Sequence, residues 1–435
     1  MNPKKVITRF PPSPTGLLHI GGVRTALFNY LFAAHNDGTM YLRFEDTDKE
    51  RSRKEFEEDI LNALHWVGIP YTPAAQLRQS EKLDVYKKHL TTLIEQGVAY
   101  EAEEAENNPD KKVVRFKNQN KTITFNDLVR GEVAFDTTDL GDFVIARSVD
   151  ESLYHLAVVI DDAESGVTHV IRGEEHISNT PRQILIIEAL GFERPQYAHI
   201  PLILAPDKSK LSKRHGAVSA NEYRKDGYIP EALVNYLALL GWNPGGEQEI
   251  FTLDELVKLF TLDRVHKAGA VFDLEKFTWF NHEHLKLLSD EEYARRFTEF
   301  SGKELEPKLI PLIKARAQTL KEAVELAEEE FNLTNYAAPD QALLLKGSRT
   351  DAEIAQKHLR HIVKELEKVH EEKFNSDTVK SAIFDYATEQ GRAGVLWPMR
   401  VALSGKDTSP DPFTLAGLLG KETTLSRIEQ ALKKL

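Results

Sequence analysis

The stretch Arg9-Phe-Pro-Pro-Ser-Pro-Thr-Gly-Leu-Leu-His-Ile-Gly-Gly22 decides the architecture of the first half of this chain. It overlaps the apolar segment 6–10, which predicts a strand, and leads into residues 21–34, which predict a helix that is apolar almost all round. A helix that begins directly after a first strand presents free backbone amides and the positive end of its dipole. The order therefore predicts a nucleotide phosphate at the start of this helix. His19 would lie beside the phosphate, and Gly21 would allow a close approach.

Two better-known phosphate-binding patterns do not occur in this stretch. The G-x-G-x-x-G spacing of dinucleotide-binding folds is missing. Gly16 and Gly21 have the spacing of a P-loop, but Gly22 stands where that loop requires lysine. A Pro/Gly turn with a chance histidine would explain His19 taken by itself. The complete string, with a strand before it and a helix after it, favours a binding role.

A second candidate for phosphate binding is Lys210-Leu-Ser-Lys-Arg214, which follows closely on the apolar segment 199–204. Its loop, residues 207–216, also carries Lys208 and has Asp207 as its only acidic residue. Mobile cations in such a loop can hold a triphosphate and stabilise a departing pyrophosphate. Most charge runs are simply solvated surface. The loop is therefore evidence for phosphate binding only because it occurs together with the first stretch.

Composition narrows the class of protein. The chain has 435 residues, of which 41% are apolar and 29% charged, as in a globular protein of about two to four domains. No segment reaches the roughly 18 consecutive apolar residues of a membrane span, and no signal-peptide pattern is present, so we expect a cytoplasmic protein without a membrane partner. Cysteine is absent, which excludes disulfides, thiol nucleophiles and thiolate metal sites. The net charge of −12 argues against non-specific coating of nucleic acid, but it does not exclude local RNA contacts.

The first half of the chain alternates predicted strands with predicted helices, which is typical of a parallel α/β sheet. One of these helices is expected to have Thr180 as its cap, Pro181 as its first residue and Gly191 as its end. Residues 98–149 interrupt the alternation with several short strand signals and indicate an insertion. The expected strands outside the insertion are residues 6–10, 40–44, 153–160, 167–171 and 199–204.

Beyond about residue 217 the strand signals end and the helix signals dominate. Four Ser or Thr residues stand three positions before a glutamate, the pattern of a capping box, and each precedes a periodic apolar segment. These four expected caps are Thr252, Ser289, Thr319 and Thr350. The C-terminal third is therefore predicted to be all-α.

The two phosphate-binding candidates are similar to the two signature sequences of class I aminoacyl-tRNA synthetases. More closely, the chain resembles a bacterial-type glutamyl-tRNA synthetase, since Leu42-Arg-Phe-Glu-Asp-Thr-Asp48 and the string from Val167 to Gln183 also match that family. The first signature ends in Gly22 rather than histidine, and the second ends in Arg214 rather than serine. Both variants occur in the glutamate branch, so they support the assignment.

The resemblance implies a fold and an activity. The fold would be a Rossmann-like α/β catalytic domain with an inserted acceptor-binding subdomain, followed by an all-α anticodon-binding domain. The activity would be ATP-dependent conversion of L-glutamate to glutamyl-adenylate, helped by Mg²⁺. The glutamyl group would then pass to the 3′-terminal adenosine of tRNA-Glu, with release of AMP and pyrophosphate, and the family suggests a monomer. The implied parts are catalytic halves at 1–97 and 150–216 (with the lysine loop), the insertion at 98–149, a stem-contact region at 217–289 and the anticodon-binding domain at 290–435.

The resemblance also assigns site residues. Those expected at ATP are Thr15, His19, Gly21, Gly22, Glu175, Ile203, Lys210, Lys213 and Arg214, and the catalytic ones among them are His19, Lys210 and Lys213. Those expected at glutamate are Arg9, Ser13, Glu45, Tyr154, Arg172 and His176. The charges of these residues agree with the assignment, because Glu45 can hold the ammonium of glutamate and Arg9 and Arg172 can pair with its two carboxylates.

Structural alternatives stand beside some of these assignments. Glu45 and Asp48 would also suit the cap of the next helix, and Arg172 would suit an ion pair with Glu174 or Glu175. The basic patch of Lys111, Lys112, Arg115 and Lys117 would face the tRNA acceptor end, although a solvated hairpin explains it equally well. We predict no structural zinc, and we expect His282-Glu283-His284 to be surface residues rather than metal ligands.

Four other functions compete with this interpretation. A glutaminyl enzyme is disfavoured because its anticodon domain is β-barrel-like, and a short tRNA-modifying paralogue would lack residues 290–435. A non-catalytic RNA-binding paralogue would be expected to lose His19, Glu45 or Lys213 first, and all three are present. A small nucleotidylyltransferase would not need the helical domain. The sequence leaves open whether the enzyme also charges tRNA-Gln.

Overall fold

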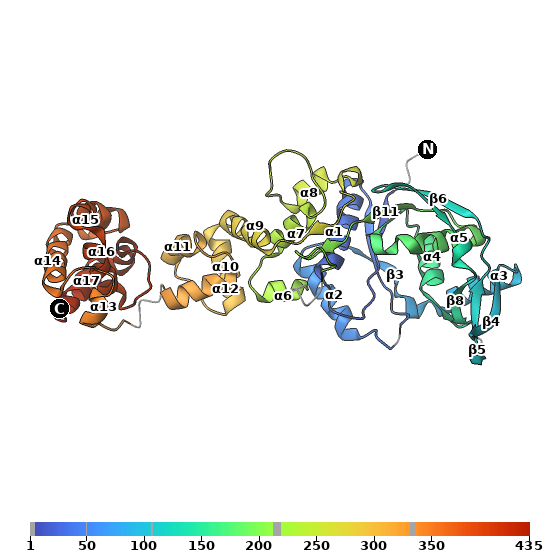
Figure 1. Ribbon diagram of the computed structural model, residues 1–435, viewed down its shortest axis with the longest axis horizontal. Helices are drawn as coiled ribbons and strands as arrows, with labels where there is room; N and C mark the ends of the chain where they lie inside the picture. The colour runs from blue at the N-terminus through green and yellow to red at the C-terminus, as the bar shows by residue number, and fades with distance from the viewer. Residues whose placement is uncertain (1–4, 49, 106–107, 212–218, 331–335) are drawn as a thin grey trace. The chain divides into compact units, whose positions relative to one another are not determined.

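The computed structural model describes residues 5–48, 50–105, 108–211, 219–330 and 336–435 (Figure 1). Two units, Met1–His284 and Leu285–Leu435, each have their own internal packing. The α/β first half and the all-α C-terminal part that the sequence predicts are both confirmed.

The first sheet of the N-terminal unit is parallel, with the strand order β1 (Ile7–Phe10), β2 (Thr39–Phe44) and β3 (Thr72–Arg78). Helix α1 (Ile20–His35) connects β1 to β2, and α2 (Lys54–Trp66) connects β2 to β3. The return from α1 to β2 requires glycine, because a Cβ on Gly38 would lie 2.3 Å from the carbonyl oxygen of Val6. This layout leaves the N-terminus of α1 at the carboxyl end of β1, where α/β proteins bind ligands.

The second half of the α/β region is formed by α4 (Tyr154–Glu164), β10 (His169–Gly173), α5 (Thr180–Leu190) and β11 (Gln196–Ile200), and β10 pairs with β11 in parallel. Thr168 links it to the first sheet: its backbone N–H donates to the carbonyl of Ile7 at 2.9 Å. This bond joins the amino ends of β1 and β10. Farther along both strands Nη1 of Arg9 donates to the carbonyl of Ile171 at 3.4 Å, so the carboxyl ends are also neighbours, although about 160 residues separate them in the chain.

The inserted residues form two different structures. One is an antiparallel sheet of β4 (Ala99–Ala105), β5 (Asn108–Phe116) and β8 (Phe143–Ser148), to which β9 (Glu151–Ser152), just after the insertion, adds a fourth strand. The other is a hairpin of β6 (Thr122–Asp127) and β7 (Gly131–Asp136), which joins the α/β sheet in the order β10-β11-β6-β7. Part of the insertion therefore extends the sheet that carries β10.

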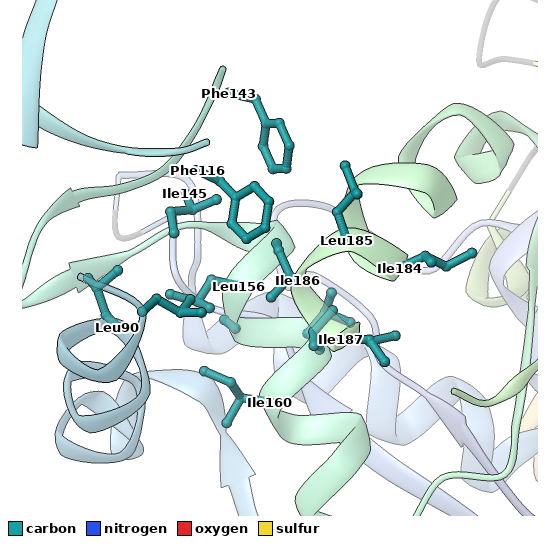
Figure 2. Close-up of a cluster of buried hydrophobic side chains, with 14 of the residues drawn as sticks. Leu90, Phe116, Phe143, Ile145, Leu156, Ile160, Ile184, Leu185, Ile186 and Ile187 are labelled. Carbon is teal, nitrogen blue, oxygen red and sulfur yellow. The ribbon is translucent and has the colours of Figure 1, made fainter. Parts of the chain in front are cut away.

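A shared apolar core holds the insertion to the α/β sheet. Figure 2 shows Phe116 from β5, Ile145 from β8, Leu156 from α4 and Ile186 from α5 converging in this core, and none of the four is measurably exposed. Helix α3 (Leu83–Glu95) adds Leu90. Each such side chain contributes roughly 1.5–3 kcal/mol by its burial.

Short helices and one two-stranded ribbon complete the N-terminal unit. The ribbon pairs β12 (Ile203–Leu204) with β13 (Ala270–Val271). The helices are α6 (Ala220–Lys225), α7 (Pro230–Leu239), α8 (Leu253–Leu259) and α9 (Leu274–Leu287), and the last of these crosses into the second unit.

The second unit, in its described residues, consists of helices and turns. Its C-terminal core is formed by residues such as Leu359, Ile383, Met399 and Ile428, all fully buried. The helices are α10 (Asp290–Ser301), α11 (Ile310–Lys314), α12 (Leu320–Glu325), α13 (Gln341–Leu345), α14 (Ala352–Glu367), α15 (Ser376–Gln390), α16 (Arg392–Ser404) and α17 (Pro412–Leu432), the last of which is broken at Gly420.

The prediction of a strand at 153–160 is wrong, because these residues begin helix α4. Residues 156–162 are all buried, so no polar face is present to reveal a helical period, and a short apolar run of this kind fits either structure. The expected strand at 199–204 is also wrong in detail. It is divided at Pro201 into the end of β11 and β12, which pair with different strands.

Two expected helix caps are also wrong. Helix α5 begins at Thr180 itself, after Asn179, and the Thr180 hydroxyl contacts Arg172 rather than capping the helix. Helix α14 is capped by Asp351, not Thr350: its carboxylate accepts the Ile354 N–H at 2.9 Å. The caps at Thr252, Ser289 and Thr319 are confirmed. The helical region also contains one short strand, β13.

Candidate active site

One cavity of about 960 Å³ lies in the N-terminal unit, between the start of α1 and the carboxyl ends of β1, β2 and β10. It brings together every predicted site residue that the structure describes. From the ATP group these are Thr15, His19, Gly21, Gly22, Glu175, Ile203 and Lys210, and from the glutamate group Arg9, Ser13, Glu45, Tyr154, Arg172 and His176. Lys213 and Arg214 lie outside the described residues.

The start of α1 forms one side of the cavity. His19 caps the helix, with its Nδ1 accepting the Gly22 N–H at 3.3 Å. Withdrawal from water inside the cavity, together with the nearby Lys210 ammonium, lowers the pKa of His19 below its usual value, so the imidazole is neutral at pH 7. A Cβ on Gly21 would lie 2.9 Å from the His19 ring. The helix start thus offers backbone amides, a positive dipole end and a histidine to an anionic ligand.

A second group of residues, which line the cavity or lie directly behind it, is strongly charged. Arg9 donates from Nε to Asp162 at 3.1 Å, and Arg43 pairs with the other oxygen of Asp162 at 2.9 Å and more loosely with Glu45 at 3.5 Å. No hydrogen-bond donor among the described residues reaches Oε1 of Glu45, although this atom is buried. Burial raises the pKa of Glu45 to about 7, against the opposing effects of Arg43 and Arg9. A ligand ammonium would supply the missing donor.

The structure excludes the capping alternative for Glu45 and Asp48. Helix α2 begins after Arg53, whose side chain makes no cap hydrogen bond. Asp48 instead accepts from the Nε of Arg51 at 2.6 Å, and both Glu45 and Asp48 line the cavity. The next helix therefore does not explain why these carboxylates are present.

The ion-pair alternative for Arg172 is excluded in the same way. Arg172 donates from Nε to Nε2 of His199 at 3.1 Å and from Nη2 to the hydroxyl of Thr180 at 2.7 Å. Glu174 pairs with Arg130, and Glu175 lines the cavity. Among the described residues Nη1 of Arg172 has no hydrogen-bond acceptor, so it is available to donate to a ligand carboxylate.

His176 and Tyr154 also line the cavity, with their ring centres 6.2 Å apart. Burial and the positive charge of Arg172 lower the pKa of His176 to about 4, so this imidazole is neutral. Its Nδ1 lies 3.1 Å from the amide nitrogen of Asn179. Burial and the Glu45 carboxylate raise the pKa of Tyr154, which keeps its hydroxyl protonated.

Sequence reasoning missed the residues behind the cavity. These residues are Arg43, Asp161 and Asp162, which hold the charged side, and Asp127 and His199, which hold Arg172. A signal existed for the aspartates, because two adjacent carboxylates end an apolar segment and charges in such segments are paired when buried.

Two further expectations concern metals and RNA. His284 is buried, with its Nε2 2.9 Å from the side-chain oxygen of Asn235, so its expected surface position is wrong. No cluster of three or more potential His, Asp or Glu metal ligands occurs within the described ranges. The absence of zinc stays a prediction. In the basic patch, Arg115 is used within the insertion, where it donates to the carbonyls of Asp142 and Glu104.

Comparisons with known proteins assign the family. Residues 5–108 and 101–279 match the catalytic domain of class I tRNA synthetases (E and Q), and residues 275–432 match an anticodon binding domain. The chain is 40% identical to a glutamate–tRNA ligase of Desulforamulus reducens, with 98% of this chain and 99% of the relative covered. It is 41% identical to the ligase of Aquifex aeolicus, with 99% of both covered.

A solved structure agrees with these relatives. The crystal structure of a glutamate tRNA ligase from Elizabethkingia meningosepticum, in complex with its amino acid, superposes with a TM-score of 0.87 at 32% identity and covers 99% of this chain and 100% of that one. Across the described ranges, no helix has both the length and the apolar character that a bilayer span requires. The catalytic-domain match, the full-length relatives and the shared structure together place this chain in the glutamate–tRNA ligase family of class I tRNA synthetases.

Proposed function

We propose that this protein activates L-glutamate with ATP and transfers the glutamyl group to the 3′-terminal adenosine of tRNA-Glu. The observation that carries the proposal is the single cavity in which a helix N-terminus suited to phosphate adjoins a charged end suited to an amino acid with two carboxylates. The products of the two steps would be glutamyl-tRNA, AMP and pyrophosphate.

The proposed chemistry depends on positioning. The α-carboxylate of glutamate is already ionised at pH 7, so no general base is needed to create the nucleophile. Arg9 and Arg172 would hold the two carboxylates and Glu45 the ammonium, which points the α-carboxylate toward the α-phosphorus of ATP. The α1 amides, His19 and Lys210 would stabilise charge on the phosphates as pyrophosphate departs.

Magnesium would enter with the nucleotide. Among the described residues no group of three His, Asp or Glu side chains forms a metal cage, and Mg²⁺ commonly binds through substrate phosphates and water. Bound in this way, it would neutralise charge on the triphosphate. The protein's own contribution to the phosphates is then the α1 amides, His19 and the lysine loop.

The contacts with tRNA are also proposals. The acceptor end would meet residues 98–149 and the anticodon would meet the helices of residues 290–435, in keeping with the division of the chain into the parts described above. Recognition of unpaired anticodon bases rests on stacking and edge contacts. Monomeric state and a cytoplasmic location belong to the same proposal.

The deciding experiment is charging of purified tRNA-Glu and tRNA-Gln transcripts with labelled glutamate and ATP, with labelled glutamine in parallel. Glutamylation of tRNA-Glu supports the proposal, and glutamylation of both tRNAs would add a role in an indirect route to glutaminyl-tRNA. Charging with glutamine, or no charging at all, would contradict it.

A matched pair of variants tests the lysine loop. Lys210→Ala should slow tRNA-dependent pyrophosphate exchange about 100-fold, because it removes a cation from the phosphate side of the cavity. Lys208 lies two residues away and does not line the cavity, so Lys208→Ala should change the rate by less than about threefold. Equal effects of the two substitutions would argue against a specific role for Lys210.

A further inference from the structure

A buried chain of three side chains lies behind the glutamate end of the cavity: Asp127, His199 and Arg172. We propose that Asp127 and His199 are positioning residues for Arg172, in which Asp127 selects the His199 tautomer that accepts a hydrogen bond from the guanidinium. The inference rests on the proposed function, since it assigns a purpose to residues behind a proposed glutamate contact. It also gives the inserted segment, to which Asp127 belongs, a part in amino-acid binding.

Asp127 reaches this position because the β6–β7 hairpin joins the α/β sheet. It is the last residue of β6 and pairs in register with Tyr197 of β11, two residues before His199; Figure 1 shows β6 close to β11. A hairpin that stayed with the antiparallel sheet of the insertion would place no carboxylate here. The contact thus depends on the hairpin's place in the sheet.

The Asp127 carboxylate is held as a charged acceptor although it is only 1% exposed. Its Oδ1 accepts the backbone N–H groups of Val129 and Arg130 at 3.0 and 2.9 Å. Its Oδ2 accepts the backbone N–H of His199 at 3.0 Å and lies 2.6 Å from the Nδ1 of the same residue. Burial alone would raise the pKa of Asp127, but the hydrogen bonds from His199 and the backbone lower it overall, so the group stays ionised.

The partners of His199 determine its tautomer. A guanidinium can only donate, so Nε2, which receives the Nε–H of Arg172 at 3.1 Å, carries no hydrogen. The one ring hydrogen must then be on Nδ1, where it points at the Asp127 carboxylate. Burial lowers the pKa of His199, which favours this neutral form over an imidazolium.

Thr180 completes the arrangement. Its hydroxyl oxygen accepts from Nη2 of Arg172 at 2.7 Å and lies 3.1 Å from Nε2 of His199. Arg172 is therefore held at two of its nitrogens by groups that are not measurably exposed, and its plane is fixed before a substrate arrives. Such fixing reduces the conformational entropy that binding a carboxylate would otherwise cost.

The decisive variant is Asp127→Asn. With its amide oxygen accepting from Val129 and Arg130, the amide NH₂ faces His199, where the hydrogen bond from the His199 backbone N–H is lost. An NH₂ facing Nδ1 favours the opposite tautomer, with hydrogen on Nε2, and this hydrogen would oppose the Nε–H of Arg172. We expect the KM for glutamate to rise at least tenfold while the KM for ATP changes less than twofold.

A matched control is available in the same hairpin. Asp136 ends β7, is exposed, and accepts the backbone N–H of Thr138 at 2.9 Å, a bond that asparagine can also accept. Asp136→Asn should leave both KM values unchanged. Arg172→Ala supplies the upper limit, since a positioning residue cannot matter more than the residue it positions. An unchanged glutamate KM in Asp127→Asn, or equal changes in both KM values, would overturn the proposal.

A second pair of variants guards against misfolding of Asp127→Asn. Thr180→Val removes the hydroxyl from a buried site with almost no change of shape, and Thr180→Ser keeps the hydroxyl. The glutamate KM should rise about threefold or more in the valine variant and stay near the wild-type value in the serine variant. Equal KM values in the two variants would count against a positioning network.

One spectroscopic measurement is independent of activity. The full-length enzyme is labelled with ¹⁵N-histidine, and the His199 ring signals are assigned by their loss in His199→Gln. In the wild type their ¹⁵N chemical shifts should show a hydrogen on Nδ1. In Asp127→Asn they should show the hydrogen on Nε2. A wild-type hydrogen on Nε2 would overturn the inference whatever the kinetics. Failure of the wild-type enzyme to charge tRNA-Glu would instead contradict the proposed function, so the two failures can be told apart.

Discussion

At the scale of single residues, Glu45 shows how a buried charge can be held ready for a ligand. It lies in a cavity with two arginines and two aspartates nearby, yet its Oε1 has no hydrogen-bond donor in the described part of the chain. A buried acceptor without a partner is costly for a folded protein. The cost is understandable if the ammonium of the substrate completes the site.

The raised pKa of Glu45 predicts a pH dependence of glutamate binding. Below pH 7 the carboxylate of the free enzyme becomes protonated and loses its attraction for the ammonium, so the KM for glutamate should rise as pH falls, by at most about tenfold per pH unit. Above pH 7 the KM should level off. Kinetics between pH 5.5 and 8.5, with the KM for ATP measured in parallel, would check this.

The variant Glu45→Gln isolates the effect. Glutamine cannot ionise, so the variant should have a raised glutamate KM at pH 8 and no further rise between pH 7 and 6. A pH profile that keeps the wild-type shape in this variant would assign the titration to another group, and would remove the argument that Glu45 holds the ammonium.

At the scale of elements, the start of α1 depends on Gly21. A Cβ there would lie 2.9 Å from Cε1 and 3.0 Å from Nδ1 of His19, so Gly21→Ala forces the ring away from its cap position on Gly22. The lost cap costs about 1 kcal/mol, and alanine in place of glycine returns a similar amount in helix propensity.

We therefore expect Gly21→Ala to separate stability from activity. Its free energy of unfolding should stay within about 1 kcal/mol of the wild type, whereas the KM for ATP should rise several-fold because His19 is displaced from the phosphate side of the cavity. The KM for glutamate serves as the internal control and should stay unchanged. A clear fall in unfolding free energy with normal ATP kinetics would show that the glycine serves folding alone.

At the scale of the whole molecule, the cavity and the C-terminal core belong to different units. Every residue that lines the cavity lies in the first unit, and Leu359 lies in the core of the second, where it is fully buried. Leu359→Ala should lower the free energy of unfolding by about 2–5 kcal/mol, because it leaves a cavity in a packed core.

At a temperature where Leu359→Ala stays folded, its KM values for glutamate and ATP should equal those of the wild type. Leu90→Ala opens a similar cavity in the core beneath the insertion, and is the variant of the first unit with which Leu359→Ala is compared. Denaturant unfolding followed by circular dichroism, together with pyrophosphate exchange, would measure both quantities. A changed KM in Leu359→Ala would reveal that the second unit influences the cavity.

The local pattern of the sequence is sufficient to predict many of the elements and site residues of this protein. Helix α1 was predictable because the string around His19 combines a strand, a turn and a helix start, and the caps at Thr252, Ser289 and Thr319 were predictable because a cap is made within four residues. The switch from α/β to all-α order could be recognised for the same reason. Lys210 and Glu45 stand in short strings whose chemistry is evident without a structure.

Only the tertiary structure decided what depends on contacts between distant residues. Helix α4 was mistaken for a strand because its neighbours bury nearly all of it and remove the period that would identify it. Asp127 and His199 are 72 residues apart and meet only because β6 joins the sheet beside β11. The sequence by itself thus determined which groups are available for the chemistry, since these are local properties of the chain. The order of the strands decided which of these side chains line the cavity and which side chains position the lining ones. Strand order is not a local property, since pairing between distant strands is set by packing over the whole domain.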